Sequence, residues 1–220
     1  MSDVAANYDL VMKRIEAAAS RSGRDPSSIR LIAVTKTVSA DRIREAAACG
    51  ITHIGENRLQ EALTKREALA DLPLTWHFIG HLQTNKAKKV TETFDCVQSV
   101  DRAEVAQKLS DLSPSRRLPI LLEVKLGGEA TKSGVDLASI AILVNNVREC
   151  PNIELRGFMT VPPYSEDPES VRPWFRALRE QAKLYGLPEL SMGMSHDFEV
   201  AIEEGATMVR IGTALFGARQ

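Results

Sequence analysis

Short apolar segments rich in β-branched residues alternate with amphipathic segments along most of this 220-residue chain. The apolar segments predict eight strands, at residues 31–36, 53–56, 76–80, 96–100, 120–125, 155–161, 190–194 and 208–211. The amphipathic segments predict an opening helix at about 3–21, then helices at 40–49, 59–70, 84–93, 103–112, 137–147, 168–184 and 198–203. Strands that alternate with helices in this way predict a parallel sheet covered by helices on both faces.

Eight such units are the number that closes a parallel sheet into a barrel. We therefore expect an α/β fold, a single (β/α)8 TIM barrel with an extra N-terminal helix. An open doubly wound sheet is the alternative, but no GxGxxG follows the first predicted strand and the glycine-rich segments come late in the chain. With 44% hydrophobic and 26% charged residues, the chain can bury one substantial core, and we expect one domain over residues 1–220.

Charge and cysteine content exclude several classes of protein. A net charge of −1 and a sequence pI of about 6.5 provide no field that would attract nucleic acid or an anionic membrane. The first residues lack a signal-peptide pattern, and no apolar run reaches the roughly 18 residues of a spanning helix. The three cysteines, Cys49, Cys96 and Cys150, have no CxxC spacing, so neither a disulfide framework nor a zinc site is indicated. We expect a cytoplasmic protein.

Lys36 is the only charge at the end of the first predicted strand. At the rim of a barrel, a partly desolvated lysine can lose its proton near neutral pH and attack a carbonyl group. This position makes Lys36 a candidate Schiff-base lysine. The alternative is a strand-end lysine whose ammonium group simply extends into solvent.

Two late segments have the composition of a phosphate site. Ser195 follows the seventh predicted strand, and Gly212 and Thr213 follow the eighth, the two positions where barrels often bind phosphate groups. Hydroxyl groups and accessible backbone N–H groups suit a phosphomonoester. Alternatively, Ser195 is a turn residue, Gly212 a packing glycine and Thr213 a helix cap. If the barrel closes, strand one lies beside strand eight, so Lys36 and these segments share one rim.

Six sequence blocks carry a family resemblance: AVTKTV at 33–38, IGEN at 54–57, WHFIGHLQTNK at 76–86, RGFMT at 156–160, SMGMS at 191–195 and VRIGTALFG at 209–217. In this order, and across nearly the whole chain, they resemble the signature blocks of the pyridoxal phosphate homeostasis protein family. The resemblance implies a fold type III barrel, similar to the N-terminal domain of alanine racemase, that holds pyridoxal 5′-phosphate (PLP) as a Schiff base. It further implies that Lys36 forms this bond and that Ser195, Gly212 and Thr213 hold the phosphate.

By the same resemblance, Arg210 faces the pyridine nitrogen of PLP. An arginine stays protonated, so it donates a hydrogen bond to that nitrogen and disfavours the pyridinium form. An unprotonated ring is the weaker electron sink, which restricts carbanion chemistry. The alternative role for Arg210 is a salt bridge with a carboxylate of the barrel.

Other positions have two interpretations each. Asn57 can hydrogen-bond the cofactor ring oxygen or cap the following helix. His77 and His81 are four apart, which in a strand puts both on one face, with His77 deeper and His81 lining the cofactor pocket; without a third ligand we expect no metal. Met159 can pack beneath the ring or fill the core. Glu56 faces away from Asn57 and can pair with a cation inside the barrel.

Racemases of this cofactor type need a second base, commonly a tyrosine from a second domain. Of Tyr8, Tyr164 and Tyr185, only Tyr164 is expected near the rim, so no second base is evident. We therefore expect a PLP-binding homeostasis protein that is not an enzyme and that supplies the cofactor to PLP-dependent apoenzymes. A PLP-dependent amino-acid racemase and a barrel that binds another phosphate ligand non-covalently are the alternatives. Without the racemase second domain, we expect a monomer.

Overall fold

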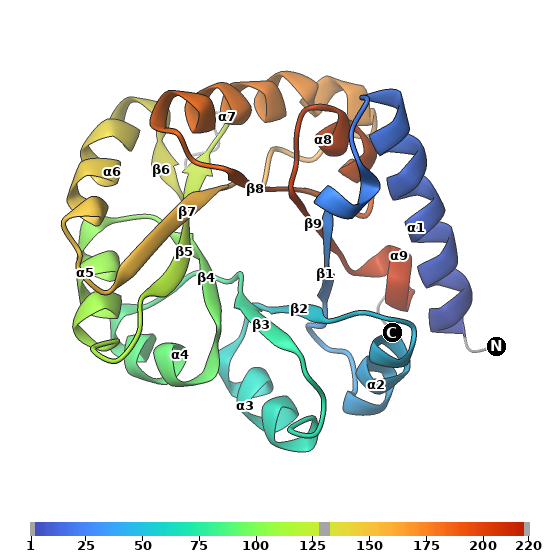
Figure 1. Ribbon diagram of the computed structural model, residues 1–220, viewed down its shortest axis with the longest axis horizontal. Coiled ribbons are helices and arrows are strands. Elements are labelled where there is room, and N and C mark those ends of the chain that lie inside the picture. Colours follow the sequence, from blue (N-terminus) through green and yellow to red (C-terminus); the bar gives the residue numbers. More distant parts are fainter. Residues whose placement is uncertain (1–2, 128–132, 218–220) are drawn as a thin grey trace.

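A closed ring of parallel strands forms the centre of the computed structural model, which describes residues 3–127 and 133–217 (Figure 1). The strands are β1 Arg30–Val34, β2 His53–Glu56, β3 Thr75–Phe78, β4 Cys96–Val100, β5 Leu118–Lys125, β6 Val135–Asp136, β7 Ile153–Met159, β8 Glu189–Met194 and β9 Met208–Ile211. Within the described residues, neighbouring strands pair in the order β1-β2-β3-β4-β5-β7-β8-β9, and β9 pairs with β1. The short β6 pairs with β5. The barrel prediction is confirmed, and the open doubly wound sheet is ruled out.

Helices surround the ring on its outer side (Figure 1). They are α1 Asp3–Arg21, α2 Ala40–Ala48, α3 Leu59–Ala68, α4 Ala87–Thr93, α5 Ala103–Asp111, α6 Ile140–Arg148, α7 Arg172–Tyr185, α8 Phe198–Glu203 and α9 Thr213–Phe216. Short 3-10 helices, η2 Thr84–Lys86, η3 Leu137–Ser139 and η4 Pro168–Val171, precede α4, α6 and α7 and account for the early starts predicted for those helices; η1 Pro26–Ser28 precedes β1. None of the helices in the described ranges is both long and apolar enough to cross a bilayer.

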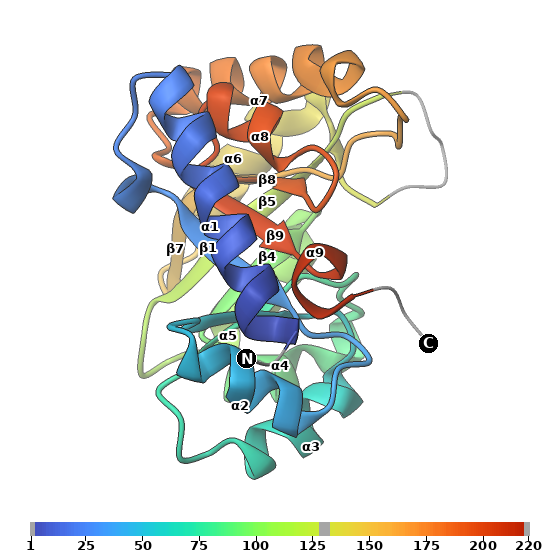
Figure 2. The same ribbon diagram turned by 90° about the vertical axis from the view of Figure 1, so that its right-hand side faces the viewer.

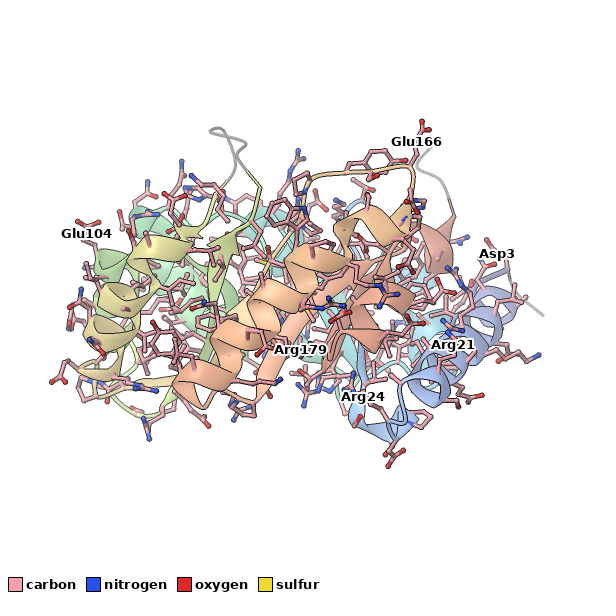
Figure 3. All side chains as sticks on the ribbon, turned by 90° about the horizontal axis from the view of Figure 1, so that it is seen from above. Asp3, Arg21, Arg24, Glu104, Glu166 and Arg179 are labelled. Atoms are coloured by element: carbon pink, nitrogen blue, oxygen red, sulfur yellow. The ribbon has the colours of Figure 1, made fainter. Side chains whose placement is uncertain are left out.

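The predicted extra helix, α1, packs against α2, α8 and α9 across the side of the barrel formed by β1 and β9 (Figure 2). Arg14 donates two hydrogen bonds to the Glu199 carboxylate, at 2.9 and 2.7 Å, and lies over the Phe198 ring on α8. Asn7 donates to the Leu215 carbonyl oxygen on α9. Asp3 and Arg21 mark the two ends of α1 in Figure 3. The extra helix α1 is thus fixed to the last two helices, α8 and α9.

Inside the ring, Ile32, Leu121, Met159 and Met208 form a buried apolar cluster. A larger core fills the space between the strands and the surrounding helices. Burial of each large aliphatic side chain contributes about 2 kcal/mol, so the packed interior supports a rigid rim.

Three strands end earlier than the sequence predicts, at Val34, Phe78 and Met159 instead of residues 36, 80 and 161. A Cβ on Gly80 would overlap the Asn57 carbonyl oxygen, so the chain leaves β3 to cross closely over the end of β2. The four-residue α9 and two-residue β6 were not predicted, because such short elements carry no periodicity. The rim is therefore made of turns where longer strands were expected.

Candidate functional site

Lys36 lies in a turn two residues beyond the end of β1, and its side chain is half-buried. It lines a cavity of about 500 Å³ together with Val34, Gly212 and Thr213. The pairing of β1 with β9 causes this proximity, because Ala33 is in register with Ile211. Lys36 and the segment after the last strand therefore share one rim, as ring closure predicts.

Ser195 lies in the turn after β8, and its Oγ accepts hydrogen bonds from the backbone N–H groups of Gly212, at 3.3 Å, and Ala214, at 3.2 Å. The two late segments therefore meet. A Cβ on Gly212 would come no closer than 3.5 Å to Val34, so packing does not require a glycine there. Gly212 is itself the N-cap of α9, so Thr213 is not the cap. Hydroxyl and N–H groups gathered beside an open cavity suit an anionic oxygen ligand.

Arg210 lies on β9 with only 4% of its surface exposed. Its Nη1 donates to the carbonyl oxygen and the Oγ of Ser191, and its Nη2 donates to the Thr160 carbonyl oxygen, each at 2.7 Å. Its partners among the described residues are therefore neutral, and the expected alternative of a salt bridge is not what fixes it. Burial lowers the pKa of the guanidinium to about 10, so it stays protonated at neutral pH.

A buried hydrogen-bond chain extends behind Arg210 through the barrel interior. Ser191 Oγ donates to Gln98 Oε1 at 2.7 Å, and Gln98 Nε2 lies 3.0 Å from His77 Nδ1. The other nitrogen of His77 lies 3.0 Å from His53 Nδ1. Burial lowers the pKa of His77 to about 3, so His77 is neutral at physiological pH. His77 was expected deep in the barrel. Gln98 was not identified, although it lies two residues from both Cys96 and Val100 on a strand whose residues are all buried.

The expected placement of His81 was partly wrong. Because β3 ends at Phe78, His81 lies in the following loop, and its side chain is 50% exposed. Its Nδ1 lies 3.6 Å from Asp101 Oδ2. His77 and His81 therefore do not share a strand face. No group of three His, Cys, Asp or Glu side chains in residues 3–127 and 133–217 is arranged to hold a metal ion.

Asn57 follows β2 and is half-buried, and its Oδ1 is buried without a hydrogen-bond partner. Asn57 does not cap α3, since the N-cap is Arg58. A second cavity of about 450 Å³ is lined by Asn57 and His81. A buried amide oxygen without a partner is costly unless a ligand or water donates to it, so Asn57 fits a ligand contact better than a helix cap.

Met159 is the last residue of β7 and is almost fully buried in the apolar cluster within the ring. Met159 therefore fills the core of the barrel, which is one of the two roles expected for it. Glu56 faces away from Asn57, as expected, but its predicted barrel-interior partner was wrong. The Glu56 carboxylate instead binds Lys65 of α3, at 2.6 Å, between the strand and the helix.

Glu123, near the end of β5, was not identified from the sequence. It is two residues beyond Leu121, which lies in the apolar cluster within the ring, so Glu123 faces the same interior near the rim. Burial raises the pKa of its carboxyl group to about 7, and Asp101 adds to this effect while Arg210 opposes it. A carboxylate at an inward position of a predicted strand end was the signal that could have revealed it.

The fold has counterparts in known proteins. The model of the alanine racemase N-terminal domain family matches residues 6–220. A curated protein from Aquifex aeolicus, named pyridoxal phosphate homeostasis protein, is 48% identical over 218 residues, which cover 96% of each chain. The chain belongs to the pyridoxal phosphate homeostasis protein family. A protein of the same name from Pseudomonas aeruginosa is also 48% identical, over 100% of this chain and 97% of that protein.

The solved structure of PipY from Synechococcus elongatus with PLP bound has a TM-score of 0.82 to this chain. The two are 39% identical, and the match covers 93% of this chain and 100% of PipY. The family resemblance inferred from the sequence blocks is therefore confirmed, and the matches span nearly the whole length of the related proteins.

Proposed function

We propose that this protein binds PLP through a Schiff base with Lys36, and that it maintains the cellular supply of PLP as a single-domain, monomeric cytoplasmic protein. It would hold the cofactor reversibly and release it to PLP-dependent apoenzymes. The names of its relatives and the PLP-bound structure of PipY support this proposal.

One observation carries the proposal: Lys36 lines the same cavity as Gly212 and Thr213, beside the hydroxyl of Ser195. An amine and a set of neutral hydrogen-bond donors on one cavity match the two ends of PLP, an aldehyde and a phosphate. The protein does not need a glycine at 212 for its own packing, and the buried Asn57 Oδ1 has no partner. The residues present therefore fit the cofactor.

Each remaining site residue has a role in the proposal. Ser195, Gly212 and Thr213 would donate hydrogen bonds to the phosphate, and Asn57 would contact the ring through its side-chain amide. Arg210, held by Ser191 and Thr160, would donate to the pyridine nitrogen. Met159 would support the ring from the barrel interior, and His81 would line the pocket from its exposed loop. Bound PLP supplies an electron sink, which a permanently protonated arginine at the ring nitrogen weakens.

A carrier is favoured over an amino-acid racemase by the positions of the tyrosines. Tyr164 is 79% exposed and its ring lies beside that of His196, while Tyr185 packs against Phe158. None of the three tyrosines lines the cavity at Lys36. If the protein were a racemase, it would exchange the α-hydrogen of alanine or serine for deuterium in heavy water at enzymatic rates.

Borohydride reduction of the PLP-loaded protein, followed by peptide mapping, tests the proposal. We expect one reduced PLP adduct, on the peptide that contains Lys36, and its loss in the Lys36→Met variant. Lys36→Met should still bind pyridoxine 5′-phosphate, which has the phosphate but no aldehyde. An adduct spread over surface lysines and unchanged in Lys36→Met would contradict the proposal, and saturation without visible-range absorption would favour a non-covalent phosphate ligand.

A further inference from the structure

The turn that carries Lys36 is hydrogen-bonded to α3 on both sides of the lysine. Glu61 Oε2 accepts a hydrogen bond from the Thr37 backbone N–H at 3.0 Å. Lys65 Nζ donates to the Thr35 carbonyl oxygen at 2.6 Å. Glu61 and Lys65 are four residues apart on the helix, so they share one face, and they contact each other at 3.4 Å. We call this pair the α3 clamp.

A buried carboxylate fixes the clamp to the barrel wall. Glu56 of β2 is fully buried, and its Oε1 accepts hydrogen bonds from Lys65 Nζ at 2.6 Å and from Thr35 Oγ1 at 2.7 Å. The Lys65 side chain is only 11% exposed. Charge-assisted hydrogen bonds in a buried setting are strong and allow little movement. The Thr35 backbone is therefore tied to both β2 and α3.

The backbone on the other side of Lys36 is strained. Thr37 has φ of +63°, and it is the one non-glycine residue with positive φ in residues 3–127 and 133–217. A β-branched residue in this region persists only where surrounding contacts hold it. The contact at the Thr37 N–H is with Glu61, and this same N–H is the main reason why the pKa of Glu61 lies below its usual value. Glu61 therefore stays ionised and keeps its hydrogen bond.

We propose that Glu61 and Lys65 are positioning residues that hold the Lys36 amine where it meets the aldehyde of PLP. The inference rests on the proposed function. Without the α3 clamp, the turn would relax and the amine would sample other positions, so bond formation would lose its favourable geometry. The phosphate donors at Ser195 and Gly212 come from the loops after β8 and β9, so loss of the clamp would leave them in place.

The prediction is a selective loss of affinity for the aldehyde form of the cofactor. In Lys65→Met and Glu61→Ala, PLP affinity should fall about tenfold or more, the value of one charged hydrogen bond, while affinity for pyridoxine 5′-phosphate changes less than about twofold. Glu61→Gln keeps an acceptor oxygen and should restore PLP affinity. The matched control is Lys89→Met, which removes an exposed lysine paired with Glu92 on α4.

Amide hydrogen exchange in the protein without PLP gives a readout that does not depend on the cofactor. The Thr37 amide should exchange faster in Glu61→Ala than in the unaltered protein, and Glu61→Gln should restore its protection. Lys65→Met leaves Glu56 buried without its charged partner, so this variant can fail to fold. Glu61 is partly exposed, so Glu61→Ala should fold even in that case.

The outcomes separate this inference from the proposed function. Three results would overturn the positioning role even if PLP binds at Lys36. The clamp variants could lose affinity equally for PLP and pyridoxine 5′-phosphate, or lose affinity for neither. The Thr37 amide could also exchange at an unchanged rate in Glu61→Ala. Failure of the unaltered protein to form an adduct on Lys36 would instead refute the proposed function.

Discussion

Glu123 should make the protein less stable as the pH rises through neutrality. Its carboxyl group has its ordinary pKa of 4.5 in the unfolded chain, and burial is the main reason why its pKa rises to about 7 in the folded protein. Between these values, the folded protein keeps a proton that the unfolded chain has released. Stability is therefore lost as the pH rises from 4.5 to about 7, because the unfolded state binds fewer protons.

The magnitude follows from the two pKa values. Each tenfold change in proton binding is worth about 1.4 kcal/mol, so complete ionisation of the half-buried Glu123 costs the folded state about 3 kcal/mol. Glu123→Gln has nearly the same shape and no titrating proton, and it removes this cost. Relative to the unaltered protein, the variant should gain stability progressively, up to about 3 kcal/mol from about pH 5 to about pH 8.

Urea unfolding followed by circular dichroism at several pH values measures this difference. The matched control is Glu104→Gln, which changes an exposed carboxylate on α5 in the same way (Figure 3). The control should show no pH-dependent gain. If the stability difference between Glu123→Gln and the unaltered protein were the same at all pH values, Glu123 would not retain its proton and the reasoning from burial would be wrong.

Three further predictions follow from single residues. Ser195→Ala should weaken binding of both PLP and pyridoxine 5′-phosphate about tenfold, measured by titration, because it removes a hydroxyl donor. If the variant bound both as tightly as the unaltered protein does, the phosphate would lie elsewhere. Gly157→Ala should destabilise the protein by more than about 3 kcal/mol in urea unfolding, because the added Cβ would overlap the Glu189 carbonyl oxygen. A urea midpoint equal to that of the unaltered protein would contradict this packing. His77 should stay neutral down to about pH 4, so its ring signals in NMR spectra should not shift between about pH 8 and pH 5, and a titration near 6.5 would show that it is not buried.

The barrel could be predicted from the sequence because each strand and helix leaves a local pattern. The strands at 53–56, 96–100 and 208–211 and the helices at 3–21 and 198–203 have the predicted bounds. In the helix at 3–21 the buried apolar residues Val11, Ile15 and Ala18 recur every three or four positions, and the strand at 208–211 ends at a glycine. The rim was harder to predict, because a strand ends where tertiary contacts compete with pairing, as where Gly80 packs on Asn57.

The site was predictable only in part for the same reason. Lys36, Ser195 and Gly212 could be brought together by topology alone, since β1 and β9 must be neighbours in a closed barrel. His81 could not be placed, because its position depends on where β3 ends. Glu123 could have been noticed as a carboxylate at a predicted strand end, but its raised pKa could not be foreseen, because it comes from burial in the folded protein.

The partners of the Lys36 turn were also beyond sequence reasoning. Glu56 was expected to find a cation inside the barrel, whereas Lys65 approaches it from α3. A two-residue periodicity puts Glu56 on the face opposite Asn57, but it shows neither that this face is the outer one nor which residue of the following helix lies opposite. That choice depends on how far α3 is rotated against the barrel wall.

A crystal structure of the protein, determined after soaking crystals with PLP, would locate both ends of the bound cofactor. We expect continuous density from Lys36 Nζ to the cofactor, with the phosphate oxygens within hydrogen-bond distance of Ser195 Oγ and the Gly212 N–H. Phosphate density on another part of the surface, or a Lys36 side chain directed away from the ring, would contradict it.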